Sequence, residues 1–196
     1  MPATAQPLIL ASGSIYRRRL LERLQLPFSW HAPDIAELRQ ADEPPHQMAE
    51  RLSLNKATPC SNQYPDALII GSDQVAVLDE QILGKPKTTE RAFEQLSLCS
   101  GKTVQFLTGL CLLDSATGKH QSTVIPFHVT FRELSNDEIT RYIEKDQPLD
   151  CAGSFKWESL GISLFESLSG NDPTALEGLP LIALSKMLRD YRLLLP

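Results

Sequence analysis

The residues best suited to chemistry in this 196-residue chain begin with a short polar segment at positions 12–19. An apolar run at 8–11 precedes it and leucines at helical spacing follow, so a strand turns into a helix there. Free backbone N–H groups and the positive end of the helix dipole favour an anion at such a junction. The candidate phosphate-binding side chains are Ser12, Ser14, Arg17 and Arg18, and Arg17, in the first turn, is the best placed of them. The alternative is a solvated arginine-rich helix face, because the segment is neither a Walker loop nor a G-x-G-x-x-G motif.

Two carboxylates are candidates for binding a metal ion or activating water. Asp73 follows a strongly apolar strand-like run and a Gly-Ser step, so we expect it where a core strand reaches the surface. Glu37 lies in an acidic loop that the topology can return to the same cleft. Such hard oxygen ligands suit Mg²⁺ or Mn²⁺, and a carboxylate can also serve as a general base. A solvated surface carboxylate is the alternative for each.

Two lysines complete a candidate phosphate site. Lys56 lies late in a predicted helix, and Lys85 lies in the turn Gly84-Lys85-Pro86, whose rigid neighbours suit a point-charge contact to phosphate. Each alone would be an ordinary surface lysine. Together, the anion site, the acids and the lysines indicate a metal-assisted enzyme that cleaves phosphoanhydrides.

Composition and the remaining reactive residues exclude other classes. With 19 Lys plus Arg against 24 Asp plus Glu, the net charge of −5 disfavours non-specific binding to nucleic acid. The four cysteines lie far apart without metal-ligand spacing, so we expect reduced thiols. No G-x-S-x-G elbow accompanies the four histidines, which argues against a serine hydrolase. The start of the chain is unlike a signal peptide and no apolar run could span a membrane, so we expect a cytoplasmic protein.

The elements that must position these side chains alternate along the chain. The expected strands are 8–11, 28–32, 67–78, 81–83, a hairpin of 103–113 with 120–131, and 161–165. The expected helices are 16–26, 47–60, one capped by Thr88 or Thr89, one opened by a capping box at Ser135 and Glu138, and a last one after Pro180. This order predicts an α/β or α+β arrangement with mixed strand pairing.

Six segments, in this order, resemble the Maf family of nucleoside triphosphate pyrophosphatases along essentially the whole chain. They are LILASGSIYRRRLLERL, DIAE, RLSLNKA, LIIGSDQVAVLD, ILGKP and CAGSFKWESLGISLFESLSGNDPTALEGLPL. The resemblance implies one α/β domain over residues 1–196. Its fold would be a mixed, elongated β-sheet flanked by helices, with two lobes around a cleft, similar to the inosine triphosphate pyrophosphatases. It also implies a homodimer.

The same resemblance assigns roles to the residues already singled out. It places Ser12 and Arg17 on the phosphates, Glu37 beside a divalent metal (Mg²⁺, Mn²⁺ or Co²⁺), Lys56 and Lys85 on the phosphate chain, and Asp73 as the base that also binds the metal. Tyr16, Gln74 and Glu158 match positions that set substrate choice. The chain departs from the common Ser-Pro-Arg-Arg opening, because Ile15 and Tyr16 precede the arginines.

The implied reaction is hydrolysis of the α–β anhydride of 7-methyl-GTP, since SDQV and AGSFKWESLG most resemble the branch with that activity. A small nucleotide would then be the partner, with no nucleic acid and no membrane. Trp157 and Phe155, beside Glu158, are candidates for stacking on the base. Two alternatives remain: a dTTP and UTP pyrophosphatase of the same family, and a non-enzymatic nucleotide-binding regulator of cell division.

Overall fold

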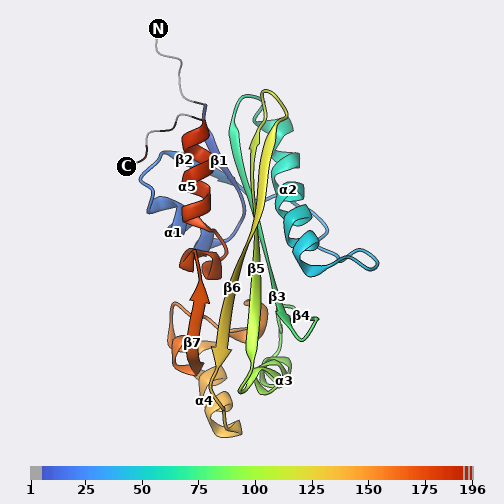
Figure 1. The fold of residues 1–196 in the computed structure, drawn as a ribbon, viewed down its shortest axis with the longest axis vertical. Coiled ribbons are helices and arrows are strands. Elements are labelled where there is room, and N and C mark those ends of the chain that lie inside the picture. The colour runs from blue at the N-terminus through green and yellow to red at the C-terminus, as the bar shows by residue number, and fades with distance from the viewer. Residues whose placement is uncertain (1–5, 192, 194, 196) are drawn as a thin grey trace.

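A single mixed sheet forms the centre of the computed structural model, which describes residues 6–191, 193 and 195 (Figure 1). Its strands are β1 (Leu8–Ala11), β2 (Phe28–His31), β3 (Leu68–Leu78), β4 (Gln81–Leu83), β5 (Thr103–Asp114), β6 (His120–Phe131) and β7 (Phe165–Gly170). The order is β2-β1-β3-β5-β6-β7, with β4 paired to β3. Strand β1 is parallel to β2 and β3, and the other pairs are antiparallel. The predicted mixed α/β fold is confirmed.

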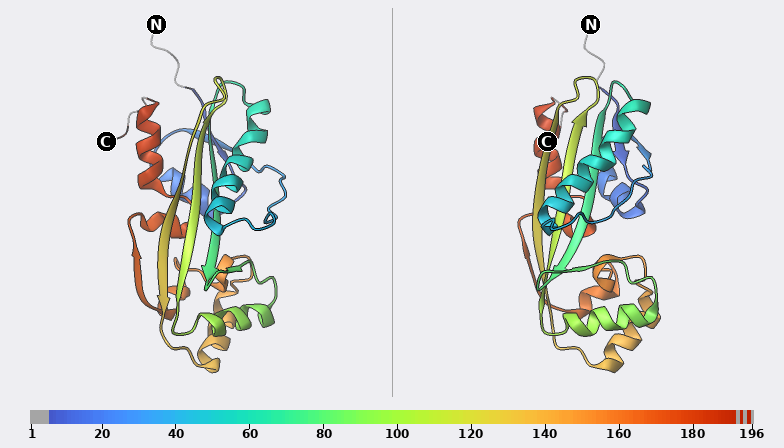
Figure 2. Two further views of the ribbon diagram at one scale, coloured as in Figure 1. Left: turned by 45° about the vertical axis from the view of Figure 1, so that its right-hand side comes forward. Right: turned by 90° about the vertical axis from the view of Figure 1, so that its right-hand side faces the viewer.

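Helices cover the sheet in two lobes, which Figure 2 shows one above the other. The α-helices are α1 (Ile15–Glu22), α2 (Pro45–Gln63), α3 (Thr89–Cys99), α4 (Asn136–Asp146) and α5 (Leu181–Asp190). The short 3-10 helices of the described residues are η1 (Ala152–Ser154), η2 (Leu160–Leu164) and η3 (Pro173–Glu177). One lobe carries β1, β2, α1, α2 and α5, and the other carries α3, α4, β4 and β7 (Figure 1). Strands β3, β5 and β6 run through both lobes.

The buried residues of the central strands pack into the cores of both lobes. In β5, Phe106 belongs to the core under α3 and α4. Further along, Leu110 packs with α1 and α5, while its neighbour Cys111 points to the opposite face and packs with α2. This alternation is what a strand covered on both faces requires.

Two glycines let α2 lie very close to the sheet. A Cβ atom at Gly71 of β3 would overlap the carbonyl oxygen of Ser53, and one at Gly109 of β5 would overlap that of Ala49. Any larger residue at either position would therefore push the helix away from the sheet. The close approach brings Lys56, one turn beyond Ser53, against β3 at Asp73.

The structure corrects two local predictions. The strand expected at 161–165 is the 3-10 helix η2, and β7 begins only at Phe165. The reason is a local backbone turn in which the N–H of Gly161 donates to the carbonyl of Lys156 at 3.0 Å. Asp73 is also not where the strand reaches the surface: the strand expected at 67–78 is present as β3, which continues through Asp73 to Leu78, and Asp73 is only 7% exposed.

Other sequence predictions are confirmed. The hairpin of β5 and β6 is present, and Ser135 and Glu138 form the capping box that opens α4. All four cysteines are free, and Cys151 is the partly buried one. None of the helices in the described part of the chain is long and apolar enough to cross a bilayer. Residues 1–5, part of the segment compared with a signal peptide, lie outside the described residues.

A partly buried ion pair anchors the loop that precedes α2 and carries Glu37. The carboxylate of Glu43, only 7% exposed, accepts from Arg51 at 2.5 and 2.7 Å and from the backbone N–H of Gln40 at 3.0 Å. The hydrogen bond from Arg51 lowers the pKa of Glu43 to about 2, against an ordinary value of 4.5. The loop is therefore tied to α2 by a charged pair.

Glu43→Gln should lower the free energy of unfolding at pH 7 by about 1 to 3 kcal/mol, the scale of a hydrogen bond to a charged group. A carboxyl whose pKa is depressed on folding stabilises the native state above its unfolded pKa and loses that contribution as the pH falls. The difference between wild type and variant should therefore shrink between about pH 4.5 and pH 2. Denaturant titrations across that range measure it. Asp42→Asn, an exposed change in the same loop, is the control, and a difference independent of pH would contradict the assignment.

Candidate active site

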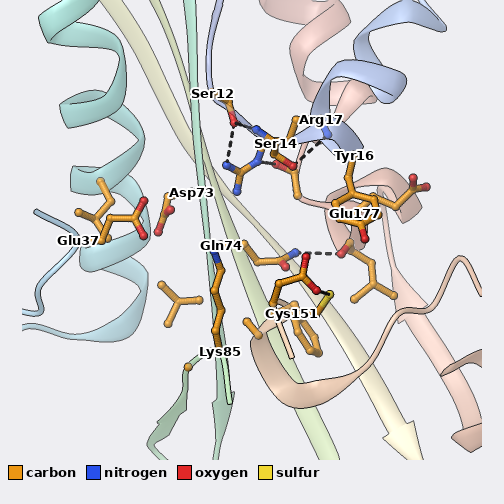
Figure 3. A pocket seen from close by; sticks show the side chains of 18 of the residues that line it. Ser12, Ser14, Tyr16, Arg17, Glu37, Asp73, Gln74, Lys85, Cys151 and Glu177 are labelled. Atoms are coloured by element: carbon orange, nitrogen blue, oxygen red, sulfur yellow. Dashed lines mark hydrogen bonds between the residues drawn. The ribbon is translucent and has the colours of Figure 1, made fainter. Parts of the chain in front are cut away.

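A cleft of about 910 Å³ lies between the two lobes and contains nearly all of the predicted site (Figure 3). Every side chain singled out from the sequence lines it except Arg18. These lining side chains come from the β1–α1 junction, the loop before α2, α2 itself, the middle of β3, the turn after β4 and the segment around η1. The fold thus brings together residues from position 12 to position 158.

The phosphate-binding end is built at the start of α1. Ser14 caps the helix, because its hydroxyl accepts from the N–H of Arg17 at 3.4 Å. The guanidinium of Arg17 donates through Nε to the carbonyl of Gly178 at 2.8 Å and through Nη1 to the hydroxyl of Ser12 at 3.4 Å. Burial lowers the pKa of Arg17, and the carboxylates of Asp73 and Glu37 oppose that shift. The result is a fixed, partly buried cation beside a helix N-terminus.

Arg18 is not brought into the cleft. Consecutive helix residues point about 100° apart, so the position after Arg17 faces elsewhere. The Arg18 guanidinium carbon lies 4.6 Å from the centre of the Trp30 ring, in a cation–π contact on the exposed edge strand β2.

The candidate catalytic carboxylates meet on one ammonium group. The Nζ atom of Lys56 lies 2.6 Å from Oδ1 of Asp73 and 2.7 Å from Oε1 of Glu37. Asp73 and Lys56 are each 7% exposed, whereas the Glu37 side chain is half exposed. Burial raises the pKa of Glu37, but the hydrogen bond and charge of Lys56, with the charges of Lys85 and Arg17, outweigh it and leave that pKa below its usual value. Glu37 is therefore ionised at neutral pH.

The donor set of these two acids fits a divalent metal. The carboxylates of Asp73 and Glu37 lie close together at one side of the cleft (Figure 3), and both contact the ammonium group of Lys56. Mg²⁺ in phosphate-transfer sites is held by one or two carboxylates together with substrate phosphates and water. Within the described residues no cluster of three or more His, Cys, Asp or Glu side chains is placed to hold a metal. An ion at Asp73 and Glu37 would complete its coordination with phosphate oxygens of the substrate and with water.

The second lobe supplies further cations. Lys85 follows β4 and enters the cleft from that side (Figure 3). Lys87 and Arg91 also line the cleft, although neither was predicted as a site residue from the sequence. The available signal was their position, two and six residues after Lys85 in the same loop and helix start.

The opposite end of the cleft is acidic and aromatic. Tyr16 and Glu158 line it together with Asp150 and Cys151. Burial raises the pKa of the Tyr16 hydroxyl, the neighbouring Cys151, Asp150 and Glu158 raise it further, and the charge of Arg19 opposes them. The carboxylates of Asp150 and Glu158 therefore lie near Tyr16, where they would attract a positively charged base.

Two of the predicted base contacts also serve the fold. The side-chain amide of Gln74 donates to the carbonyls of Ala175 at 2.8 Å and Leu176 at 3.1 Å. Phe155 is 6% exposed and packs edge-on against neighbouring phenylalanines, so it is mainly a core residue. Trp157 lines the cleft as well and remains the more accessible aromatic.

The chain is similar to a known protein family over nearly its whole length. The family model described as "Maf-like protein" matches residues 7–191. The chain belongs to the Maf family. That match includes every residue lining the cleft of this Maf protein.

Its relatives are similar over nearly their whole length. A protein of Pseudomonas putida named 7-methyl-GTP pyrophosphatase is 58% identical over 97% of this chain and 99% of its own. Proteins with the same name from Pseudomonas aeruginosa, 55% identical over 96% and 98%, and from Aromatoleum aromaticum, 54% identical over 96% and 97%, are also similar.

Proposed function

We propose that this Maf protein hydrolyses the α–β anhydride of 7-methyl-GTP, giving 7-methyl-GMP and pyrophosphate. The observation that carries the proposal is the difference in charged side chains between the two ends of one cleft. Arg17, Lys56 and Lys85 meet paired carboxylates at one end, and acidic side chains surround Tyr16 at the other. A triphosphate fits the first end and a cationic base fits the second. The name shared by relatives at 54 to 58% identity supports the same substrate.

Each residue has a role in this proposal. Asp73 orients the attacking water as the general base, and Ser12, Ser14 and Arg17 bind the phosphates. Lys56 and Lys85 stabilise negative charge on the departing pyrophosphate. A divalent cation held by Asp73 and Glu37, Mg²⁺, Mn²⁺ or Co²⁺, would neutralise phosphate charge and make bound water more acidic.

Release of pyrophosphate from a panel of triphosphates tests the activity. We expect 7-methyl-GTP to be cleaved with the highest kcat/KM in the presence of one of these cations, and a chelator to abolish turnover. A higher kcat/KM for dTTP or UTP than for 7-methyl-GTP would show that the protein catalyses the same reaction on pyrimidine triphosphates. Nucleotide binding without any pyrophosphate release would favour a regulator instead.

Glu158→Gln should lower kcat/KM for 7-methyl-GTP by roughly 10- to 100-fold, about 1.4 to 2.7 kcal/mol, while pyrimidine triphosphates gain relatively. Guanine presents N1–H and its amino group side by side, and a carboxylate accepts from both. The amide exchanges one acceptor for a donor and loses the attraction to the cationic base. Glu166→Gln, the same change at an exposed position of β7, is the control. An unchanged ratio of kcat/KM values for 7-methyl-GTP and UTP would exclude Glu158 as the residue that reads the base.

We further infer that residues 1–196 form one domain that works as a homodimer in the cytoplasm on free nucleotides, without nucleic acid or membrane partners. The net charge of −5 supports the exclusion of nucleic acid. Light scattering of the purified protein measures the oligomeric state, and a monomer at micromolar concentration would contradict the dimer.

A further inference from the structure

A short turn beneath the cleft holds several of its side chains by backbone carbonyl groups. The turn consists of η3 and Gly178, which adopts a left-handed conformation with φ of 93°. The carbonyl of Gly178 accepts from Nε of Arg17 and from the hydroxyl of Ser72, each at 2.8 Å. The carbonyl of Ala175 accepts from Gln74 and from the buried Thr108, also at 2.8 Å. One turn therefore fixes a phosphate-binding side chain and a base-end side chain together.

The bond to Nε sets the orientation of the Arg17 guanidinium. Because this planar group has donors at fixed angles, holding Nε on one side determines where the remaining N–H groups point. A lysine at the same position would keep the charge but could not be oriented this way. The location of the Gly178 carbonyl thus decides how Arg17 meets the phosphates.

Asp172 and Thr174 hold this turn from behind, and neither lines the cleft. Asp172, 3% exposed, accepts from the hydroxyl of Thr174 at 2.6 Å and from the N–H of Ile182, at the start of α5, at 2.8 Å. The Thr174 hydroxyl in turn accepts from the N–H of Leu181 at 2.7 Å. These bonds join η3 to the N-terminus of α5, where a carboxylate is favoured.

We propose that Asp172 and Thr174 are positioning residues for Arg17, acting through the Gly178 carbonyl. The inference rests on the proposed function in one respect, namely that Arg17 binds phosphate. It assigns a catalytic consequence to two buried side chains that do not line the cleft.

A double-mutant cycle tests the proposal. Thr174→Val keeps the size but removes the hydroxyl, and we expect kcat/KM for 7-methyl-GTP and affinity for inorganic pyrophosphate each to fall about tenfold. Thr174→Ser restores the hydroxyl and should stay within twofold of wild type. In an Arg17→Lys background, where no Nε–H exists, Thr174→Val should change both quantities less than twofold. Circular dichroism at the assay temperature verifies that all variants are folded.

The outcomes separate positioning from general damage. If Thr174→Val lowers kcat/KM and pyrophosphate affinity equally with Arg17 and with Arg17→Lys, the proposal is overturned, because a merely structural defect does not depend on Arg17. The proposal is also overturned if Thr174→Val lowers neither quantity when Arg17 is present. If Thr174→Val does not fold, Asp172→Asn, which replaces one of the two accepting carboxylate oxygens by a donor, takes its place in the cycle. If the wild type binds pyrophosphate but leaves 7-methyl-GTP intact, the proposed function fails while the pyrophosphate cycle still decides the positioning role.

Discussion

Asp73→Asn should lower kcat for 7-methyl-GTP by at least about 100-fold while the protein folds normally. The amide has nearly the same shape as the carboxylate, so the packing of β3 is kept. It cannot accept a proton from water, and a lost general base typically costs about 10² to 10⁴ in rate. The buried contact between Asp73 and Lys56, at 2.6 Å, places this carboxylate at the centre of the cationic end of the cleft. Steady-state kinetics at saturating metal and nucleotide measure kcat directly.

The control for this change lies in the turn directly after the same strand. Asp79→Asn removes the same charge from an exposed residue that pairs with Lys102 at 3.4 Å. It should leave kcat within twofold of wild type, because exposed ion pairs contribute little. Near-wild-type turnover of Asp73→Asn under saturating metal would show that another group activates the water.

Arg17→Ala should lower kcat/KM by about 100-fold. The variant loses charge-assisted hydrogen bonds to phosphate, and a loss of about 2.7 kcal/mol corresponds to that factor. The chain contains its own control, since Arg18→Ala removes an identical side chain one position further along α1. Because Arg18 stacks on Trp30 outside the cleft, we expect its loss to change kcat/KM less than threefold.

Lys85→Ala should resemble Arg17→Ala in direction, with its loss divided between kcat and KM. Measuring kcat and KM of Lys87→Ala as well compares Lys85 with a second lysine that lines the cleft from the same loop. If Arg17→Ala and Lys85→Ala both hydrolyse 7-methyl-GTP like the wild type, the triphosphate does not occupy this end of the cleft.

Sequence patterns predict the long central elements well because each has a strong local signal. The hairpin of β5 and β6 has two apolar strand-like runs around a Gly-containing turn, and the capping box at Ser135 is a local hydrogen-bond motif. The strand expected at 161–165 failed because a short apolar run fits several backbone conformations, and a turn closed by Gly161 decided between them.

The sequence predicts which residues form the site better than it predicts how those residues are arranged. Glu37, Lys56 and Asp73 could be named as candidates, but their meeting depends on how closely α2 approaches the sheet. That distance is set by Gly71 and Gly109, whose role is visible only once the helix is in place. Likewise, the helical phase that separates Arg17 from Arg18 depends on where α1 begins.

The continuity of β3, β5 and β6 through both lobes limits how the cleft can move (Figure 2). A loop hinge between lobes absorbs rotation in a few backbone dihedrals, but three strands bonded side by side resist bending as a unit. Narrowing of the cleft around a nucleotide must therefore come from twist spread along these strands or from the loops at its rim. The part of the phosphate end that is formed by β1, α1 and β3 should keep its shape through the catalytic cycle, whereas the loop that brings Lys85 to the same end should make the larger excursion.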